Sequence, residues 1–243
     1  MNVGWYLRCH MAKIHPAPGI YPSGFAFLSK LKKNNNREWF HAHKEEYLQE
    51  LRLVETFADA LLENLNAHDR IETPSGKSAL YRIYRDTRFS GDKTPYKTKW
   101  SGHFRRATQY RRGGYHFNIE QGNSFIAGGF WGPNPQDLKR IRDDIAFDAA
   151  PLRKIFKSKS FVAMFKELKG EQLKTAPKGF EAGHEAIDLL RYKQFLLVRP
   201  FSDKEVLGKT FLKEANLSFK AMRPFFDYMS EVLATDSNGT GKG

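Results

Sequence analysis

The spacing of hydrophobic residues changes twice along the chain and divides it into helical, extended and again helical parts. In the first part, apolar positions recur every three or four residues, which predicts a helix from Asn35 to about Asn66, after a short helix over 25–33. Asn35 and Glu38 have the spacing of a capping box, so Asn35 is the expected N-cap. In the middle part the period falls to two, which predicts strands. These strands are expected at 80–85, 99–106, 114–120 and 124–131.

Beyond Gly132 the helical period returns. Asn134 is the expected N-cap of a helix with Pro135 at its first position, and Ser202 with Glu205 repeats the capping-box spacing. The remaining elements expected here are a short helix from 151, helices at 160–169 (stopped by Gly170), 184–192 and 211–233 (bent or interrupted at Pro224), and a strand at 195–199.

Consecutive strands joined by short turns predict an antiparallel meander. With helices before and after it, the expected fold class is α+β, with three to five strands packed against helices from both ends of the chain. We expect one domain over 23–234, preceded by an extended lead-in at 1–22 and followed by a disordered tail at 235–243.

Charge changes this picture because it is concentrated in one place. The formal net charge is +13, and residues 81–112 hold ten Lys and Arg against two Asp, a net charge of +8. A field of this sign attracts nucleic acids and phosphorylated or carboxylated molecules.

Several classes of protein are disfavoured by what the sequence lacks. The single cysteine, Cys9, excludes an internal disulfide and a multi-cysteine metal site, and a reducing cytoplasm is the expected compartment. No apolar run approaches the roughly 20 residues of a spanning helix, so no membrane partner is expected. Met11 is an alternative start, so no chemistry is assigned to Cys9 or His10. No phosphate loop, GxGxxG, HExxH or GxSxG motif occurs, and the chain therefore names no cofactor.

Three stretches together resemble a known family. They are FLSKLKKNNNREWFHAHKEEY, YRIYRDTRFSGDKTPYKT, and APKGF followed by His184 and Leu189-Leu190. In this order they are similar to domain of unknown function 2461, over roughly Phe25 to Leu233. The resemblance implies a single-domain intracellular protein of bacteria or fungi, and it transfers no activity. The family usually has Asp-His-Pro where this chain has Gly183-His184-Glu185.

The basic block suggests an anion-binding loop. Arginine offers a planar fork for phosphate or carboxylate, and lysine a point charge. The expected ligand-binding residues are Arg82, Arg85, Arg88, Lys93, Tyr96 and Lys97, with Lys178 from a later turn closing over them. Asp86, Asp92 and His103 are the candidate acid–base groups. The alternative role for Asp86 and Asp92 is to pair with the arginines and fix the loop.

Alternation within the meander directs His103 and Arg105 away from the core, and does the same for His116 and Glu120. Two imidazoles and a carboxylate on one face could hold a metal or move protons, but hydrogen-bonded histidines are the simpler interpretation, and no metal site is predicted.

Three hypotheses follow. The first is a pocket for an anionic small molecule around 82–97, with or without catalysis. The second is a nucleic-acid-binding module that uses the basic hairpin 99–114, with Arg105, Arg106, Arg111 and Arg112. The third is a structural or interaction protein whose arginines are paired internally.

Overall fold

The computed structural model describes residues 17–107 and 111–234 and has the α+β architecture expected from the sequence. Its antiparallel sheet has the strand order β1-β2-β3-β4, so the meander is confirmed and the later strand joins it beside β3. The strands are β1 (Trp100–Arg105), β2 (Gly114–Ile119), β3 (Ser124–Phe130) and β4 (Phe195–Phe201).

Helices come from both ends of the chain. Those before the sheet are α1 (Pro22–Lys33), α2 (Arg37–Ala42), α3 (Lys44–Asn66) and α4 (Gly76–Ala79). Those after β3 are α5 (Pro135–Phe147), α6 (Ala150–Phe156), α7 (Lys159–Phe165), α8 (Ile187–Leu190), α9 (Asp203–Val206) and α10 (Phe211–Ala234). In the parts of the chain that the structure describes, none of these helices is both long and apolar enough to cross a membrane.

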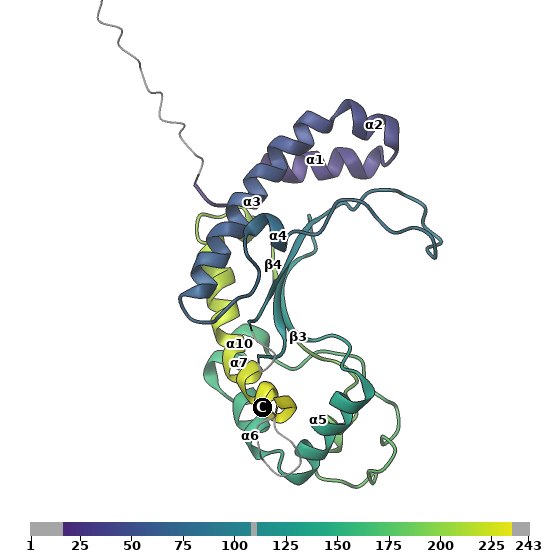
Figure 1. Cartoon of the computed structure of the whole chain (residues 1–243), viewed down its shortest axis with the longest axis vertical. Helices are drawn as coiled ribbons and strands as arrows, with labels where there is room; N and C mark the ends of the chain where they lie inside the picture. Colours follow the sequence, from purple (N-terminus) through teal and green to yellow (C-terminus); the bar gives the residue numbers. More distant parts are fainter. Residues whose placement is uncertain (1–16, 108–110, 235–243) are drawn as a thin grey trace, which may run out of the picture.

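The two long helices, α3 and α10, cover one face of the sheet. Phe57 of α3 packs edge-on against Phe117, at 5.9 Å between ring centroids, and Phe219 of α10 lies 5.0 Å from Tyr115. Large buried aromatic rings of this kind contribute most of the apolar area that stabilises such a core. Figure 1 shows both helices along the convex side of the curved sheet.

The other face of the sheet is concave, and no helix of residues 17–107 and 111–234 lies flat against it (Figure 1). One end of this concave side is bordered by α1, α2 and the loop before β1, and the other end by α5 and the segment after α7. Because neighbouring side chains in a strand point to opposite faces, residues one position out of step with the core reach this side. The concave face is therefore where sheet residues are available to a ligand.

The second helix differs from the sequence prediction at its start. The N-cap is Asn36, whose side chain accepts a hydrogen bond from the Trp39 backbone N–H, and the helix breaks at His43 into α2 and α3. Asn35 has another role, because its side-chain amide donates to the Tyr96 carbonyl at 2.9 Å and accepts from the Tyr96 N–H at 3.1 Å. The expected cap thus holds the basic loop against the helices.

The strand expected at 80–85 is an extended segment without a continuous ladder. Leu80 and Tyr84 form single bridges to Gly102 and Tyr96, and Tyr81 donates a backbone hydrogen bond to Ser101. Leu80 thus pairs with β1, whereas Tyr84 pairs with a later part of the same loop. Because the partner changes within five residues, no regular strand forms.

Two later helices are shorter than expected. In α7 the break comes before Gly170, because Lys166 adopts φ of 64° and cannot continue the helix. In the segment before α8, Nδ1 of His184 accepts from the Ala186 N–H and holds a turn in place of helix. The predicted caps at Asn134 and Ser202 are confirmed, the latter as a full capping box, and α10 continues through Pro224 without interruption. The expected tail at 235–243 and most of the lead-in lie outside the described residues.

A buried charge cluster joins the hairpin between β1 and β2 to the helices. Arg106 is 2% exposed, and its guanidinium donates to Asp69 at 2.6 Å and to Asp227 at 2.5 Å. Arg111 donates to Asp69 at 2.7 Å, as does the hydroxyl of Tyr115. Burial alone would raise the pKa of Asp69, but the hydrogen bonds from Tyr115 and Arg106 outweigh it and hold the pKa below its ordinary value.

Candidate functional site

The loop between α4 and β1 carries most of the residues that the sequence nominates. It folds back on itself through two backbone hydrogen bonds, from Lys97 N–H to the Ile83 carbonyl at 2.7 Å and from Arg85 N–H to the Pro95 carbonyl at 2.9 Å. Figure 1 shows that it projects from the sheet toward the concave side.

Most charges at the tip of this loop are paired within the loop. Arg85 hydrogen bonds to Asp92 and to Thr94, and Arg88 pairs with Asp86 at 2.7 Å. The Arg–Asp pairing expected as the structural alternative is therefore present.

Both aspartates are held as hydrogen-bond acceptors. The backbone N–H of Thr94, followed by the side chain of Arg85, lowers the pKa of Asp92 to about 2, and hydrogen bonds from Arg88 lower the pKa of Asp86. A carboxylate that stays ionised and already engaged is a poor proton donor near neutral pH. Of the three acid–base candidates, His103 alone is in the sheet.

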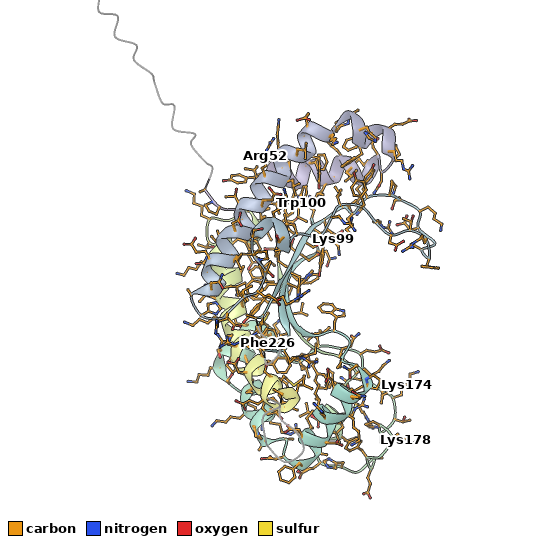
Figure 2. The ribbon with its side chains drawn as sticks, in the orientation of Figure 1. Arg52, Lys99, Trp100, Lys174, Lys178 and Phe226 are labelled. Carbon is orange, nitrogen blue, oxygen red and sulfur yellow. The ribbon has the colours of Figure 1, made fainter. Side chains whose placement is uncertain are left out.

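The remaining nominated residues are in different places. Tyr96 is 3% exposed and stacks on Phe40 at 4.1 Å, so its ring belongs to the core. Lys93 donates to the Thr87 carbonyl at 3.0 Å. Lys178 is exposed and lies with Lys174 on the opposite arm from Lys99 (Figure 2).

Three cations beside β1 lack a carboxylate partner among the described residues: Arg82, Lys97 and Lys99. Lys97 donates to the Arg82 carbonyl at 2.7 Å, and its ammonium lies 5.6 Å from the ring centroid of Tyr81. Burial lowers the pKa of Lys97, and the charges of Lys99 and Arg82 lower it further. The charge of Lys97 is therefore opposed by those of both Lys99 and Arg82.

Two of these cations line a cavity of about 330 Å³, called here the basic cavity. It is lined by Lys32, Asn35, Arg85, Asp92, Thr94, Tyr96, Lys97, Thr98, Lys99 and Glu120. Its lining holds four cations and two carboxylates. Asp92 binds Arg85, which also lines the cavity, and Glu120 accepts from the Asn123 side chain at 3.0 Å. The cavity therefore keeps an excess of positive charge.

A second cavity, of about 270 Å³, lies on the concave face of the sheet and is called here the histidine cavity. It is lined by Tyr81, His103, Gly114, His116, Gly128, Gly129 and Trp131. His103 and His116 are direct cross-strand partners, which confirms that the meander places them on one face. The ring centroid of His116 lies 5.9 Å from that of Tyr81 and 6.2 Å from that of Trp131.

Both imidazoles are neutral at physiological pH. Burial, then the charges of His103 and Lys99, lower the pKa of His116 to about 4. Burial, then Arg105, lowers the pKa of His103. A neutral imidazole offers one N–H donor and one nitrogen acceptor, so the pair can bind groups of either kind without carrying charge.

A third cavity, of about 350 Å³, shares Tyr81 and His103 with the histidine cavity and continues along the edge of β1 to Ser78 and Arg105. The side chains of Tyr81 and His103 thus separate two hollows. No three His, Cys, Asp or Glu side chains in the described parts of the chain are grouped so that they could hold a metal ion.

Stability should depend on pH through His116. Its folded-state pKa of about 4 lies below the unfolded value near 6.5, so its contribution is complete above about pH 6.5 and is lost as the pH falls toward 4. For one group that takes up one proton, the free energy of unfolding changes by at most about 1.4 kcal/mol per pH unit. Urea unfolding at several pH values should show a smaller slope for His116→Gln, and an unchanged slope would contradict this assignment.

The arginines of the hairpin are mostly engaged within the protein. Arg106 and Arg111 belong to the buried cluster, and Arg112 pairs with Asp137. Arg105 remains exposed, 3.9 Å from Glu72. Residues 108–110 of the hairpin tip lie outside the described residues. Little of this arginine charge is left for a nucleic-acid backbone.

A family model described as "Conserved hypothetical protein (DUF2461)" matches residues 23–228 of this chain. The chain belongs to the DUF2461 family. The match covers the helices before the sheet, all four strands and most of α10, so every residue that lines the histidine and basic cavities lies within the DUF2461 region. No curated protein and no solved structure gave a match.

The sequence prediction for this DUF2461 chain missed Tyr81, Lys99 and Trp131 as candidate site residues. Every second residue of a strand faces the same side, so counting back from His103 to Ser101 and Lys99 would have placed Lys99 on the face of the histidines. Tyr81 and Trp131 are half exposed, at 51% and 53%, which is unusual for rings this large. Tyr81 precedes β1 and Trp131 follows β3, so the alternation within the strands does not predict that their rings lie near His116.

Proposed function

We propose that this protein binds a small phosphorylated or carboxylated anion on the concave side of its sheet. The observation that carries the proposal is the group formed by Arg82, Lys97 and Lys99, in which the charges of Arg82 and Lys99 both oppose that of Lys97. None of the three has a carboxylate partner among the described residues. Keeping like charges together and partly buried costs free energy. An anion bound between them would recover that cost.

The surrounding contacts favour a bound molecule over a diffuse surface attraction. Lys97 is restrained by its hydrogen bond to the Arg82 carbonyl and by the ring of Tyr81. Preorganised donors lose less conformational entropy on binding than free lysine side chains. The basic cavity beside them is large enough for a phosphate or carboxylate group.

We expect Lys99→Ala to weaken binding of pyrophosphate and citrate about tenfold, because a charge-assisted hydrogen bond is lost. Isothermal titration calorimetry at low ionic strength measures this, since salt screens exposed charges. Lys174→Ala is the control for the loss of one lysine charge, because Lys174 is exposed and lies far from Lys99 at the other end of the molecule (Figure 2). Absence of binding, or equal effects of the two substitutions, would refute the proposal.

A further inference from the structure

The histidine cavity has the features of a site for a flat ring. Tyr81 and Trp131 border it while remaining about half exposed, so each ring is accessible on the cavity side. The ring of Trp131 stands edge-on to His116 at an interplanar angle of 66°, and that of Tyr81 is tilted by 36°. Exposed aromatic rings around a hollow of this size are stacking surfaces for a planar ligand.

Glycines form part of the floor of this cavity. Gly114 pairs with Arg105 and lies under the imidazole of His103, where an added Cβ would be 2.5 Å from Cε1 of that ring. The missing side chain at Gly114 therefore lets the His103 imidazole lie over the sheet as one wall of the cavity. Gly129 lines the same hollow from β3, and its missing side chain lets β3 approach the Phe195 carbonyl of β4.

Two neutral imidazoles contribute polar atoms to the lining, which contains no carboxylate. The ring of His116 already hydrogen bonds to the Gly102 backbone and offers its other nitrogen, whereas His103 can both donate and accept. Together they match the mixed donors and acceptors on the edge of a nucleobase. A cationic ring would find no counter-charge among the lining residues, whereas a neutral base needs none.

The histidine cavity adjoins the cations of the proposed anion site through Tyr81. The Lys97 ammonium lies 5.6 Å from the Tyr81 ring centroid, and that ring lies 5.9 Å from the ring of His116. Lys99 is close enough to His116 to contribute to its lowered pKa. A ligand with a flat ring joined to an anionic group could therefore contact both sets of residues.

We infer that the ligand is a mononucleotide whose base lies in the histidine cavity between Tyr81 and Trp131 and whose phosphate lies at Lys97 and Lys99. This inference rests on the proposed function and assigns the chemical class of the ligand. Aromatic stacking supplies the preference for a base, and the neutral imidazoles of His103 and His116 bind its edge.

Calorimetric titration with AMP, ribose 5-phosphate, adenosine and benzoate tests the inference. We expect AMP to bind about tenfold or more tightly than ribose 5-phosphate, because only AMP carries the ring that stacks. Trp131→Ala should remove that advantage and leave the affinity for ribose 5-phosphate unchanged, and Trp131→Phe should retain most of it. Phe147→Ala is the control, because Phe147 is an aromatic residue that is 92% exposed and outside the cavity.

The outcomes distinguish this inference from the proposed function. The nucleotide assignment is overturned by any of three results: equal affinities for AMP and ribose 5-phosphate, benzoate binding as tightly as AMP, or an AMP affinity that Trp131→Ala does not change. In each of these cases Lys99-dependent binding of pyrophosphate or citrate would still support the anion site. If pyrophosphate, citrate and AMP all fail to bind, both proposals are wrong.

Discussion

Replacing Arg106 by methionine is expected to lower the free energy of unfolding by about 3–5 kcal/mol, because it removes the fully buried guanidinium that pairs with the buried carboxylate of Asp69. The Arg106 side chain is 1% exposed and that of Asp69 is fully buried, so water cannot take the place of the lost guanidinium. The substitution also removes the hydrogen bonds from Arg106 to the Arg112 carbonyl and to Asp227. Urea unfolding followed by circular dichroism measures the change.

The neighbouring residue gives a matched control. Arg105→Met makes the same chemical change one position earlier, where the side chain is 72% exposed and lies 3.9 Å from Glu72. An exposed pair of this kind contributes at most about 1 kcal/mol. Equal losses for the two variants would contradict the role assigned to the buried cluster.

The same pair of proteins should differ in acid. The pKa of Asp69 is depressed in the folded state, so its contribution is complete above the unfolded value near 3.9 and is lost as the pH falls through the lower folded value. Arg106→Met removes a donor that depresses this pKa, so less stability remains to be lost in acid. The difference in stability between wild type and variant should therefore be smaller at low pH than at pH 7, and a constant difference would contradict the argument.

The alternation of apolar and polar residues was sufficient to predict the antiparallel sheet and which residues of β1 and β2 share a face. The period of two fixes which side each residue of β1 and β2 faces, so the sequence placed His103 and His116 on one face. That the two are direct partners depends on the register, which the structure supplies. The same alternation puts Arg106 on the side of Phe104, toward the helices. Composition alone had grouped Arg106 with the exposed Arg105.

Contacts between distant segments decided what the pattern could not. Asn35 and Asn36 are chemically identical caps, and the choice between them is made by the hydrogen bonds of Asn35 to Tyr96, which lies in another element. The cations of the loop looked like one group in the sequence. The structure divides them according to whether a carboxylate is within reach. Four are left unpaired by any described acid: Lys93, which donates to a backbone carbonyl, and the group of Arg82, Lys97 and Lys99 beside β1.

Gly129 to alanine is expected to destabilise the protein by about 2–5 kcal/mol, because both the backbone conformation and the available space at this position exclude a side chain. Its φ is 139°, and an added Cβ would lie 2.1 Å from the carbonyl oxygen of Phe195 on the adjacent strand. Relief requires β3 and β4 to separate at Gly129 and Leu196, beneath the histidine cavity. Loss of stability should therefore be accompanied by weaker binding of AMP.

Two other glycines separate the cost of the backbone conformation from the cost of the steric clash. Gly122 also has a positive φ, 73°, but an added Cβ would meet nothing within 4 Å, so Gly122→Ala measures the backbone cost alone, about 1 kcal/mol. Gly132→Ala should be nearly neutral, because it has open space and a φ outside the left-handed range. Unfolding free energies in urea should then fall in the order Gly132→Ala, Gly122→Ala, Gly129→Ala. If Gly129→Ala costs no more than Gly122→Ala, the two strands can separate there without penalty, and the steric cost assigned to the close approach of Gly129 and Phe195 is wrong.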